Sequence, residues 1–260
     1  MAEARRLKPR IAIAGAEEYA ARAARAVAEA IEAAYAERGW CSIALAGGST
    51  PKPVYDRLAA DPAFDGLPWE RLRVFYGDER CVPPDDPRSN HRMAREALLS
   101  RRPIPAERIH PMPGEREDRH RAATEYTAIL PDRIDLVLLG VGADGHTASL
   151  FPGSSALAAR EPGALAVRSD ADPPWRITVT PPVIELARRV IVLARGADKA
   201  VPIARALTGS WDPVRTPAQL ARSGFWILDR EAASALPESL IHKTTVDRAG
   251  DGLSEEREEK

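Results

Sequence analysis

The segment LVLLGVGADGHTASLFPGS, residues 136–154, carries the strongest indication of the fold. It opens with four consecutive apolar residues, 136–139, and such an unbroken run is typical of a strand buried on both faces of a parallel sheet. Two glycines end the run, and a loop then presents Asp144 and His146. Residues 147–150 can continue as the first turn of a helix. A histidine that follows the C-terminal end of a buried strand lies where open α/β sheets bind ligands.

His146 is therefore a candidate general base. Near a helix N-terminus, the positive end of the helix dipole disfavours the imidazolium and keeps the ring neutral. A neutral imidazole is well suited to accept a proton near neutral pH. In the competing interpretation, Asp144 caps the helix and His146 is an ordinary surface loop residue. The segment alone leaves both interpretations open.

Strands and helices alternate along most of the chain. Strands are predicted over 10–14, 41–46, 72–76, 136–139, 177–180, 190–194 and 225–228, and helices over 17–38, 51–60, 90–100, 119–130, 183–189 and 199–207. This order predicts an α/β fold with a doubly wound, mostly parallel sheet and helices on both faces, a Rossmann-like three-layer sandwich. We expect one domain over residues 1–246. Residues 247–260 form a charged tail without apolar periodicity, and we expect them to be disordered.

Composition excludes several classes of function. The formal net charge of the 260 residues is −1, which gives no electrostatic basis for binding nucleic acid or an anionic membrane. No apolar stretch approaches the roughly 20 residues that span a bilayer, and the N-terminus lacks the apolar core of a secretory signal. The five histidines and two cysteines show no metal-ligand spacing, so no bound metal is expected. We expect a cytoplasmic protein.

Four motifs rich in glycine and charge follow the ends of predicted strands. They are GGST at 47–50, GDER at 77–80, GVGADGH at 140–146 and GADK at 196–199. Because the C-terminal ends of parallel strands meet at one edge of a sheet, the four loops are expected to line one crevice. Unrelated surface loops would not follow strand ends so consistently.

The GGST motif is a candidate phosphate loop. Gly47 and Gly48 allow close approach of the backbone, and Pro51 suits the first position of a helix. The amides of Ser49 and Thr50 would then face an anion at a helix N-terminus. The motif lacks the GK[ST] end of a Walker loop. The alternative is a tight strand-to-helix turn in which Thr50 is only the N-cap.

The other motifs supply cations. A planar guanidinium is the preferred partner for bidentate contact with phosphate, which makes Arg80 a candidate ligand. Lys199 would add a point charge. Taken in isolation, an exposed ion pair at Arg80 and an exposed lysine at Lys199 are the more ordinary interpretations. Ser89 and Asn90 precede a predicted helix and are interpreted as its cap.

Four segments together resemble the 6-phosphogluconolactonase family. They are LAGGSTPKPVYDRLA, VFYGDERCVPPDDPRSNHRMAREALL, LVLLGVGADGHTASLFPGS and RITVTPPVIELARRVIVLARGADKA. The similarity extends from about residue 10 to residue 235, in the family's order and spacing. It implies hydrolysis of 6-phospho-D-glucono-1,5-lactone to 6-phospho-D-gluconate in the oxidative pentose phosphate pathway. It implies no metal and no organic cofactor.

The resemblance also implies roles for individual residues. His146 matches the general base, whereas Asp78 and Asp144 match acidic positions near the reacting carbon. Arg80 and Lys199 match phosphate-binding cations. The full substrate-binding set that we expect is Gly47, Gly48, Ser49, Thr50, Arg80, Arg176 and Lys199. The expected partner is a small sugar-phosphate lactone, and the expected assembly is a monomer or small homo-oligomer.

Two other functions are considered. Glucosamine-6-phosphate deaminase resembles this chain, but its DGHIAFNEP signature has a glutamate five residues after the histidine. Phe151 occupies that position here and cannot accept a hydrogen bond from His146. A sugar-phosphate-sensing module that binds without turnover is the second alternative. A sensor would normally carry a further domain and would have no need of His146.

Overall fold

The main sheet is entirely parallel. The computed structural model describes residues 9–241 of the chain. Its strands are β1 (Arg10–Ala14), β2 (Cys41–Leu45), β3 (Leu72–Tyr76), β5 (Leu136–Leu139), β8 (Arg189–Ala194) and β9 (Phe225–Asp229). They lie in the order β1-β9-β8-β5-β2-β3, and each neighbouring pair is parallel. The predicted doubly wound α/β sheet is confirmed.

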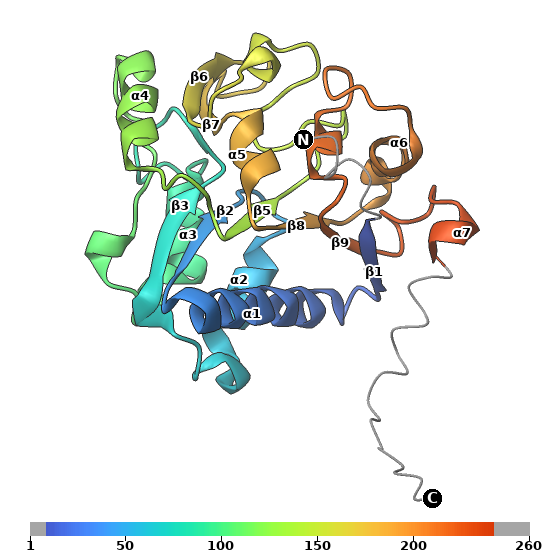
Figure 1. Ribbon diagram of the computed structural model, residues 1–260, viewed down its shortest axis with the longest axis horizontal. Coiled ribbons are helices and arrows are strands. Elements are labelled where there is room, and N and C mark those ends of the chain that lie inside the picture. The colour runs from blue at the N-terminus through green and yellow to red at the C-terminus, as the bar shows by residue number, and fades with distance from the viewer. Residues whose placement is uncertain (1–8, 242–260) are drawn as a thin grey trace, which may run out of the picture.

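Helices cover both faces of this sheet, as the three-layer prediction requires. They are α1 (Tyr19–Arg38), α2 (Lys52–Ala60), α3 (Asn90–Ala97), α4 (Arg119–Ile129), α5 (Pro181–Leu186), α6 (Ala200–Thr208) and α7 (Glu238–Ile241). Figure 1 shows α1 and α2 along one face and α4 and α5 along the other. No helix within residues 9–241 is long and apolar enough to cross a membrane. The boundary proposed at residue 246 and the tail that follows lie outside the described residues.

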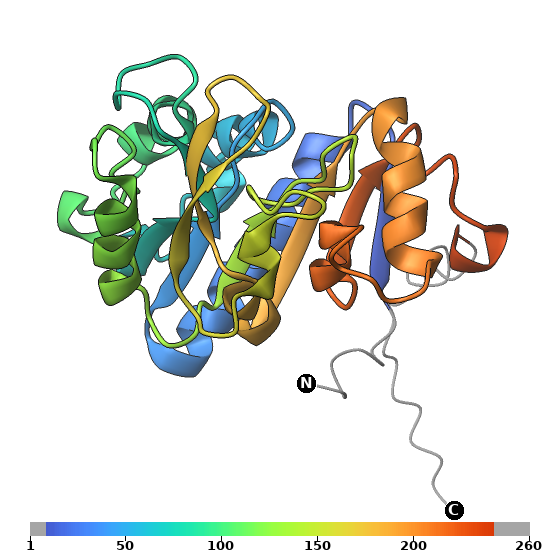
Figure 2. The same cartoon turned by 90° about the horizontal axis from the view of Figure 1, so that it is seen from above.

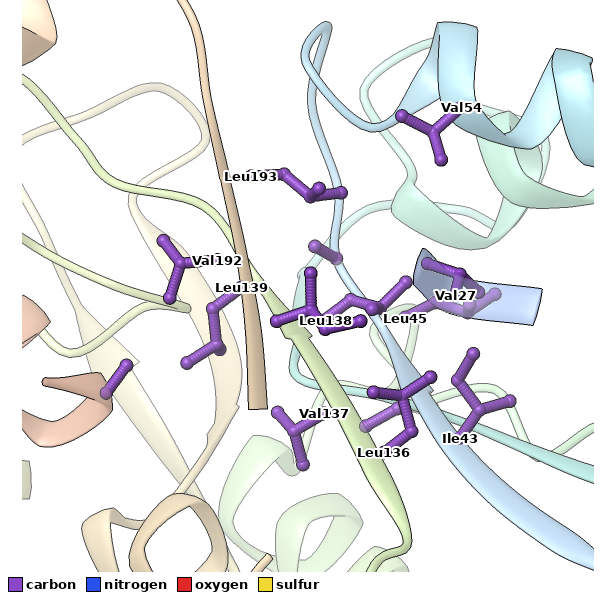
Figure 3. Close-up of a cluster of buried hydrophobic side chains, with 14 of the residues drawn as sticks. Val27, Ile43, Leu45, Val54, Leu136, Val137, Leu138, Leu139, Val192 and Leu193 are labelled. Carbon is purple, nitrogen blue, oxygen red and sulfur yellow. The ribbon is translucent and has the colours of Figure 1, made fainter. Parts of the chain in front are cut away.

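The apolar run of β5 forms the centre of the core. All four of its side chains are at most 1% exposed, so both faces of the strand are buried, as its sequence predicts. Figure 3 shows Leu136 and Leu138 on the side of α1, near Val27, and Val137 and Leu139 on the opposite side. Because successive side chains of a strand point to opposite faces, an unbroken apolar run supplies both layers of the core.

The strand order reverses between β2 and β5. From β2 the chain continues outward to β3 at one edge, whereas from β5 it continues through β8 and β9 toward β1 at the other edge. The loops that leave β2 and β5 therefore separate, and the crevice between them is the position where open α/β sheets bind ligands. The GGST loop and the loop of His146 follow these two strands.

A second, antiparallel sheet was not expected from the sequence. It consists of β4 (Asp78–Arg80), β7 (Trp175–Val179) and β6 (Ala164–Arg168), in the order β4-β7-β6. The GDER motif is thus largely a strand rather than the predicted loop, and the strand predicted at 177–180 belongs to this sheet rather than to the main one. Figures 1 and 2 show β6 and β7, in gold, beside the loop that follows β5.

The helical turn expected at 147–150 is absent. Ala148 has a left-handed φ of 47°, and Thr147 and Leu150 form an isolated antiparallel bridge. The hydroxyl of Thr147 donates to the carbonyl of Gly140 at 2.8 Å. A side chain that bonds a more distant backbone group in this way competes with helix formation. The expectation that a helix dipole keeps His146 neutral is therefore wrong.

Replacing Leu138 by alanine should destabilise the protein strongly. Leu138 is fully buried, and a leucine-to-alanine change in a packed core typically costs about 2–5 kcal/mol. Urea unfolding measures the change. Val201, which is 60% exposed, supplies the control, since Val201→Ala should lie within about 0.5 kcal/mol of the wild type. Equal stabilities for the two variants would contradict the packing described for β5.

Candidate active site

Residues of all four glycine-rich motifs meet at a cavity of about 230 Å³ at the C-terminal edge of the main sheet. Its lining includes every residue that the sequence assigned to the site except Asp144: Gly47, Gly48, Ser49, Thr50, Asp78, Arg80, His146, Arg176 and Lys199. Asp144 lies beside it, on a larger open groove that shares only His146 with the cavity. The arrangement predicted for the strand-end loops is thus present in the structure.

Asp144 and His146 form a pair within one short loop. Oδ1 of Asp144 lies 2.6 Å from Nδ1 of His146 and accepts the backbone N–H of His146 at 3.0 Å. Burial opposes ionisation of Asp144, but these hydrogen bonds and the charge interaction with His146 outweigh it and lower the pKa of Asp144. A carboxylate can only accept, so Nδ1 carries the proton. In the neutral ring Nε2 then keeps a free lone pair.

The loop that carries this pair requires glycine at residue 142. A Cβ at Gly142 would lie only 2.1 Å from Nδ1 of His146. At this distance any side chain at residue 142 would clash with the imidazole. The backbone N–H of Gly142 donates to the carbonyl of His146 at 2.8 Å, and that of Gly145 donates to Gly142 at 2.9 Å. The imidazole therefore packs directly on the backbone of its own loop, and the GVGADGH motif fixes its position.

The phosphate loop presents backbone donors to the cavity. Within residues 9–241, no group accepts a hydrogen bond from the N–H of Gly48, Ser49 or Thr50. The α2 helix begins directly after this loop, with Pro51 at the N-cap and no side-chain cap. The alternative in which Thr50 is merely the cap is therefore wrong. Unpaired amides at the start of a helix form a site for an anion.

Two arginines form a cross-strand pair on the cavity wall. Arg80 of β4 lies directly opposite Arg176 of β7, and the Nε atoms of both are buried without a hydrogen-bond partner in residues 9–241. Burial, together with the charge of Arg80, lowers the pKa of Arg176. The Nη1 of Arg80 is held by the carbonyl of Arg88 at 2.8 Å. Lys199 pairs with Asp198 at 2.8 Å, so its charge is partly compensated.

Asp78 is the carboxylate of the cavity and is 7% exposed. Its Oδ1 accepts from Nδ2 of Asn90 at 3.0 Å, and its Oδ2 accepts from the hydroxyl of Ser149 at 2.5 Å. Both donors are buried. Sequence reasoning missed Ser149, and it interpreted Asn90 only as part of a helix cap. The structure shows that Ser89 is the cap, accepting from the N–H of Arg92 at 3.1 Å.

Glu79 was also missed as a structural element of the site. It is 3% exposed and does not line the cavity as Asp78 and Arg80 do, because neighbouring residues of a strand face opposite sides. Its carboxylate accepts the backbone N–H groups of Arg80, Asn90 and His91 at 2.7–2.8 Å. Burial nevertheless raises the pKa of Glu79. The middle residue of β4 thus joins this strand to the start of α3.

Phe151 lies against the imidazole of His146. Its ring centroid is 4.7 Å from that of His146, with the planes tilted by 45°. The guanidinium of Arg176 lies over the same ring, 5.8 Å from its centroid. One apolar ring therefore contacts both the base and a cation. Phe151 limits the positions that the imidazole can adopt, and it offers His146 no acceptor.

The described residues offer no evident metal centre. No group of three or more histidine, cysteine, aspartate or glutamate side chains within residues 9–241 is placed to hold a metal ion. In particular, Asp78 is bonded to Asn90 and Ser149, whereas Asp144 is bonded to His146. The carboxylates and the imidazole therefore belong to two separate hydrogen-bonded groups.

Known proteins resemble this chain over most of its length. The profile of the family described as glucosamine-6-phosphate isomerases/6-phosphogluconolactonase matches residues 14–227. A 6-phosphogluconolactonase of Synechocystis is 41% identical over 83% of this chain and 92% of its own length. The solved structure of 6-phosphogluconolactonase from Trypanosoma brucei is 35% identical, with a TM-score of 0.77, and covers 89% of this chain and 100% of that one.

A solved monomeric glucosamine-6-phosphate deaminase shares the fold, with a TM-score of 0.75 at 22% identity over 87% of this chain and 99% of its own. At that identity the likeness concerns the fold alone. The extent of the profile match and the identity to the Synechocystis relative establish the family itself. The chain belongs to the glucosamine-6-phosphate isomerase/6-phosphogluconolactonase family.

Proposed function

We propose that this protein hydrolyses 6-phospho-D-glucono-1,5-lactone to 6-phospho-D-gluconate, the lactone-opening reaction of the oxidative pentose phosphate pathway. The observation that carries the proposal is the meeting of His146, held by Asp144, with three cations and the amides of the GGST loop at one cavity. The relatives named 6-phosphogluconolactonase support it, since one is 41% identical over 92% of its own length.

The base mechanism follows from the hydrogen bonds of His146. With Nδ1–H directed at Asp144, Nε2 takes a proton from a water molecule as that water attacks the lactone carbonyl carbon. The resulting imidazolium is stabilised by the adjacent carboxylate. It returns the proton to the ring oxygen as the ester bond breaks. General-base assistance typically supplies about 10²–10⁴-fold, and an activated ester needs no protein nucleophile.

The phosphate supplies binding energy far from the reacting carbon. We assign this group to Arg80, Arg176 and Lys199, which line the cavity and would neutralise its charge, with the amides of the GGST loop as donors to its oxygens. Binding at this remote group orients the lactone so that its carbonyl carbon lies near the base. Asp78, with both oxygens already held, can accept hydrogen bonds from sugar hydroxyls through its remaining lone pairs. The reaction as proposed needs no metal or organic cofactor.

The two alternative functions have less support. Deamination of glucosamine 6-phosphate would lack the acceptor that its signature places five residues after the histidine, because Phe151 is there. A sensing module would have no use for the Asp144–His146 pair. We further propose a cytoplasmic enzyme, active as a monomer or small homo-oligomer, that does not bind nucleic acid.

Replacing His146 by glutamine should lower kcat at least about 10²-fold and leave KM nearly unchanged. Activity of the wild type should fall as acid protonates the imidazole. Because the pKa of Asp144 is lowered, its carboxylate persists below the usual aspartate range. We therefore expect protonation of the histidine, and not of Asp144, to cause this fall in activity. The pH dependence of kcat/KM for 6-phosphogluconolactone measures this.

Two variants serve as controls for this test. Asp144→Asn should reduce activity but retain the acid limb, whereas His146→Gln should lose it. His120→Gln, at an exposed histidine outside the cavity, should behave as the wild type. An unchanged acid limb in His146→Gln would remove His146 from the role of base.

Replacing Arg80 by alanine should lower kcat/KM about 10- to 100-fold, which corresponds to the roughly 1.5–3 kcal/mol of a hydrogen bond to a charged group. The loss should vanish when D-glucono-1,5-lactone, which has no phosphate, is the substrate. Arg189→Ala removes the same charge at the opposite end of the sheet, where β8 begins, and should have no effect. An equal loss on both lactones would contradict phosphate binding by Arg80.

The protein should release no ammonia from glucosamine 6-phosphate, and Phe151→Glu should not create that activity. The new carboxylate would lie beside His146 and Arg176, where it competes with Asp144 for the imidazole and neutralises a phosphate-binding cation. Lactonase activity should therefore fall, whereas Phe151→Leu should largely retain it. Ammonia release by the wild type would refute the proposed function. Release by the variant alone would show that one glutamate suffices for deamination.

A further inference from the structure

Asn90, the first residue of α3, lies between two parts of the cavity wall, the phosphate loop and Asp78. It is 1% exposed and borders the cavity. Its Nδ2 donates to Asp78 twice, to the backbone carbonyl at 2.9 Å and to Oδ1 at 3.0 Å. Both donor hydrogens of the side-chain amide are thereby used on one residue. Asn90 therefore fixes the backbone and the carboxylate of Asp78 together.

The carbonyl end of the same amide faces the phosphate loop. Oδ1 of Asn90 is buried and has no hydrogen-bond partner among residues 9–241. A Cβ at Gly47 would lie only 1.8 Å from it, so the Cα hydrogen that a side chain would replace points at this oxygen. Cα–H groups donate weakly to such acceptors. The amide thus spans the space between the loop after β2 and the strand that follows β3.

The position of Asn90 is itself fixed from behind. Its backbone N–H donates to Oε1 of Glu79 at 2.7 Å, and the N–H of His91 donates to Oε2 at 2.8 Å. Glu79 is buried between Asp78 and Arg80 on β4. These hydrogen bonds therefore tie the start of α3 to β4, the strand that carries Asp78 and Arg80.

Ser149 completes the arrangement from the side of the base. Its hydroxyl donates to Oδ2 of Asp78 at 2.5 Å, and its N–H donates to Oγ1 of Thr178 at 3.1 Å. Ser149 lies three residues after His146 on the same loop. Asp78 is therefore connected to the phosphate loop through Asn90 and to the loop of the base through Ser149.

We propose that Asn90 is a positioning residue of this site: its side-chain amide sets the spacing between the phosphate loop at Gly47 and the carboxylate of Asp78. The proposal rests on the proposed lactonase function, because these two points hold opposite ends of the sugar phosphate. A shift of either point would leave the phosphate bound but the lactone carbon displaced from His146. Misplacement of about 1 Å can cost about 10²-fold in rate.

The first test uses Asn90→Asp, which keeps the shape but replaces Nδ2 by oxygen. Two carboxylates would then lie at about the 3.0 Å that separates Nδ2 from Oδ1 of Asp78. Such a pair shares a proton at acid pH, which restores the hydrogen bond, and repels when that proton is lost. We expect kcat to fall about 10²-fold at neutral pH and the pH optimum to move to lower pH. The inhibition constant of inorganic phosphate, which probes the phosphate site alone, should change little.

Ser89→Ala is the matched control at the same helix start. It removes the cap of α3 and one hydrogen bond to Oε2 of Glu79 but leaves the side-chain amide of Asn90 intact, so it should lower thermal stability without moving the pH optimum. If Asn90→Asp also keeps the wild-type optimum, or if it loses phosphate affinity as strongly as kcat, Asn90 has only a structural role and the proposal is wrong.

The second test is a double-mutant cycle with Gly47. Gly47→Ala alone should reduce kcat/KM strongly, because its methyl group would meet Oδ1 of Asn90. In the Asn90→Ala background the same change should cost far less, since the opposing atom is gone. Additive effects would overturn the spacing role of Asn90. Wild-type turnover of the lactone is measured first, and its absence would refute the proposed function rather than this inference.

Discussion

The reversal of strand order between β2 and β5 is the constraint on which the site depends. These two strands pair through Ile43 with Leu136 and Ala44 with Val137, deep in the core, and their continuations then diverge to opposite edges of the sheet. The loop after β2 therefore leads to one side and the loop after β5 to the other, and a crevice is left open above these two strands. One loop carries the backbone amides and the other carries the imidazole. The anion site and His146 therefore face each other above two rigid, buried strands.

The second sheet closes this crevice, and Gly77 joins it to the first. The N–H of Gly77 donates to Leu45 of β2 at 2.9 Å, and its carbonyl accepts from Val179 of β7 at 2.9 Å. From that point strand alternation distributes the next three side chains. Asp78 and Arg80 face the cavity and Glu79 faces α3. One tripeptide thus supplies a carboxylate, a guanidinium and the anchor that holds both, and no two of these functions compete for the same space.

The sequence predicted those parts of this arrangement that depend on neighbouring residues, namely the buried strand and the positions of the glycine-rich motifs. The apolar run 136–139 is a core strand because nothing polar interrupts it, and the glycine-rich motifs meet because parallel strands end at one edge. Residues 78–80 read as a loop because their strand partner, at 176–178, lies about a hundred residues away. The turn at 147–150 was misassigned because the bonds of Thr147 and Ser149 reach Gly140 and Asp78. Such distant partners leave no periodic signal.

The same limit explains why the site residues were found unequally. Arg80 and Lys199 carry charge and His146 carries a titratable ring, and these chemical properties can be recognised from the residue type alone. Asn90 is a neutral residue in a Ser-Asn pair before a helix, where a cap explains it fully. Its contacts to Asp78 and toward Gly47 exist only because α3 begins between two strand ends. The role of a neutral amide that joins two loops depends on its position in the fold, whereas the charge of a cation already indicates that it can bind phosphate. Residues that set spacing are therefore the part of a site that a single sequence conceals most readily.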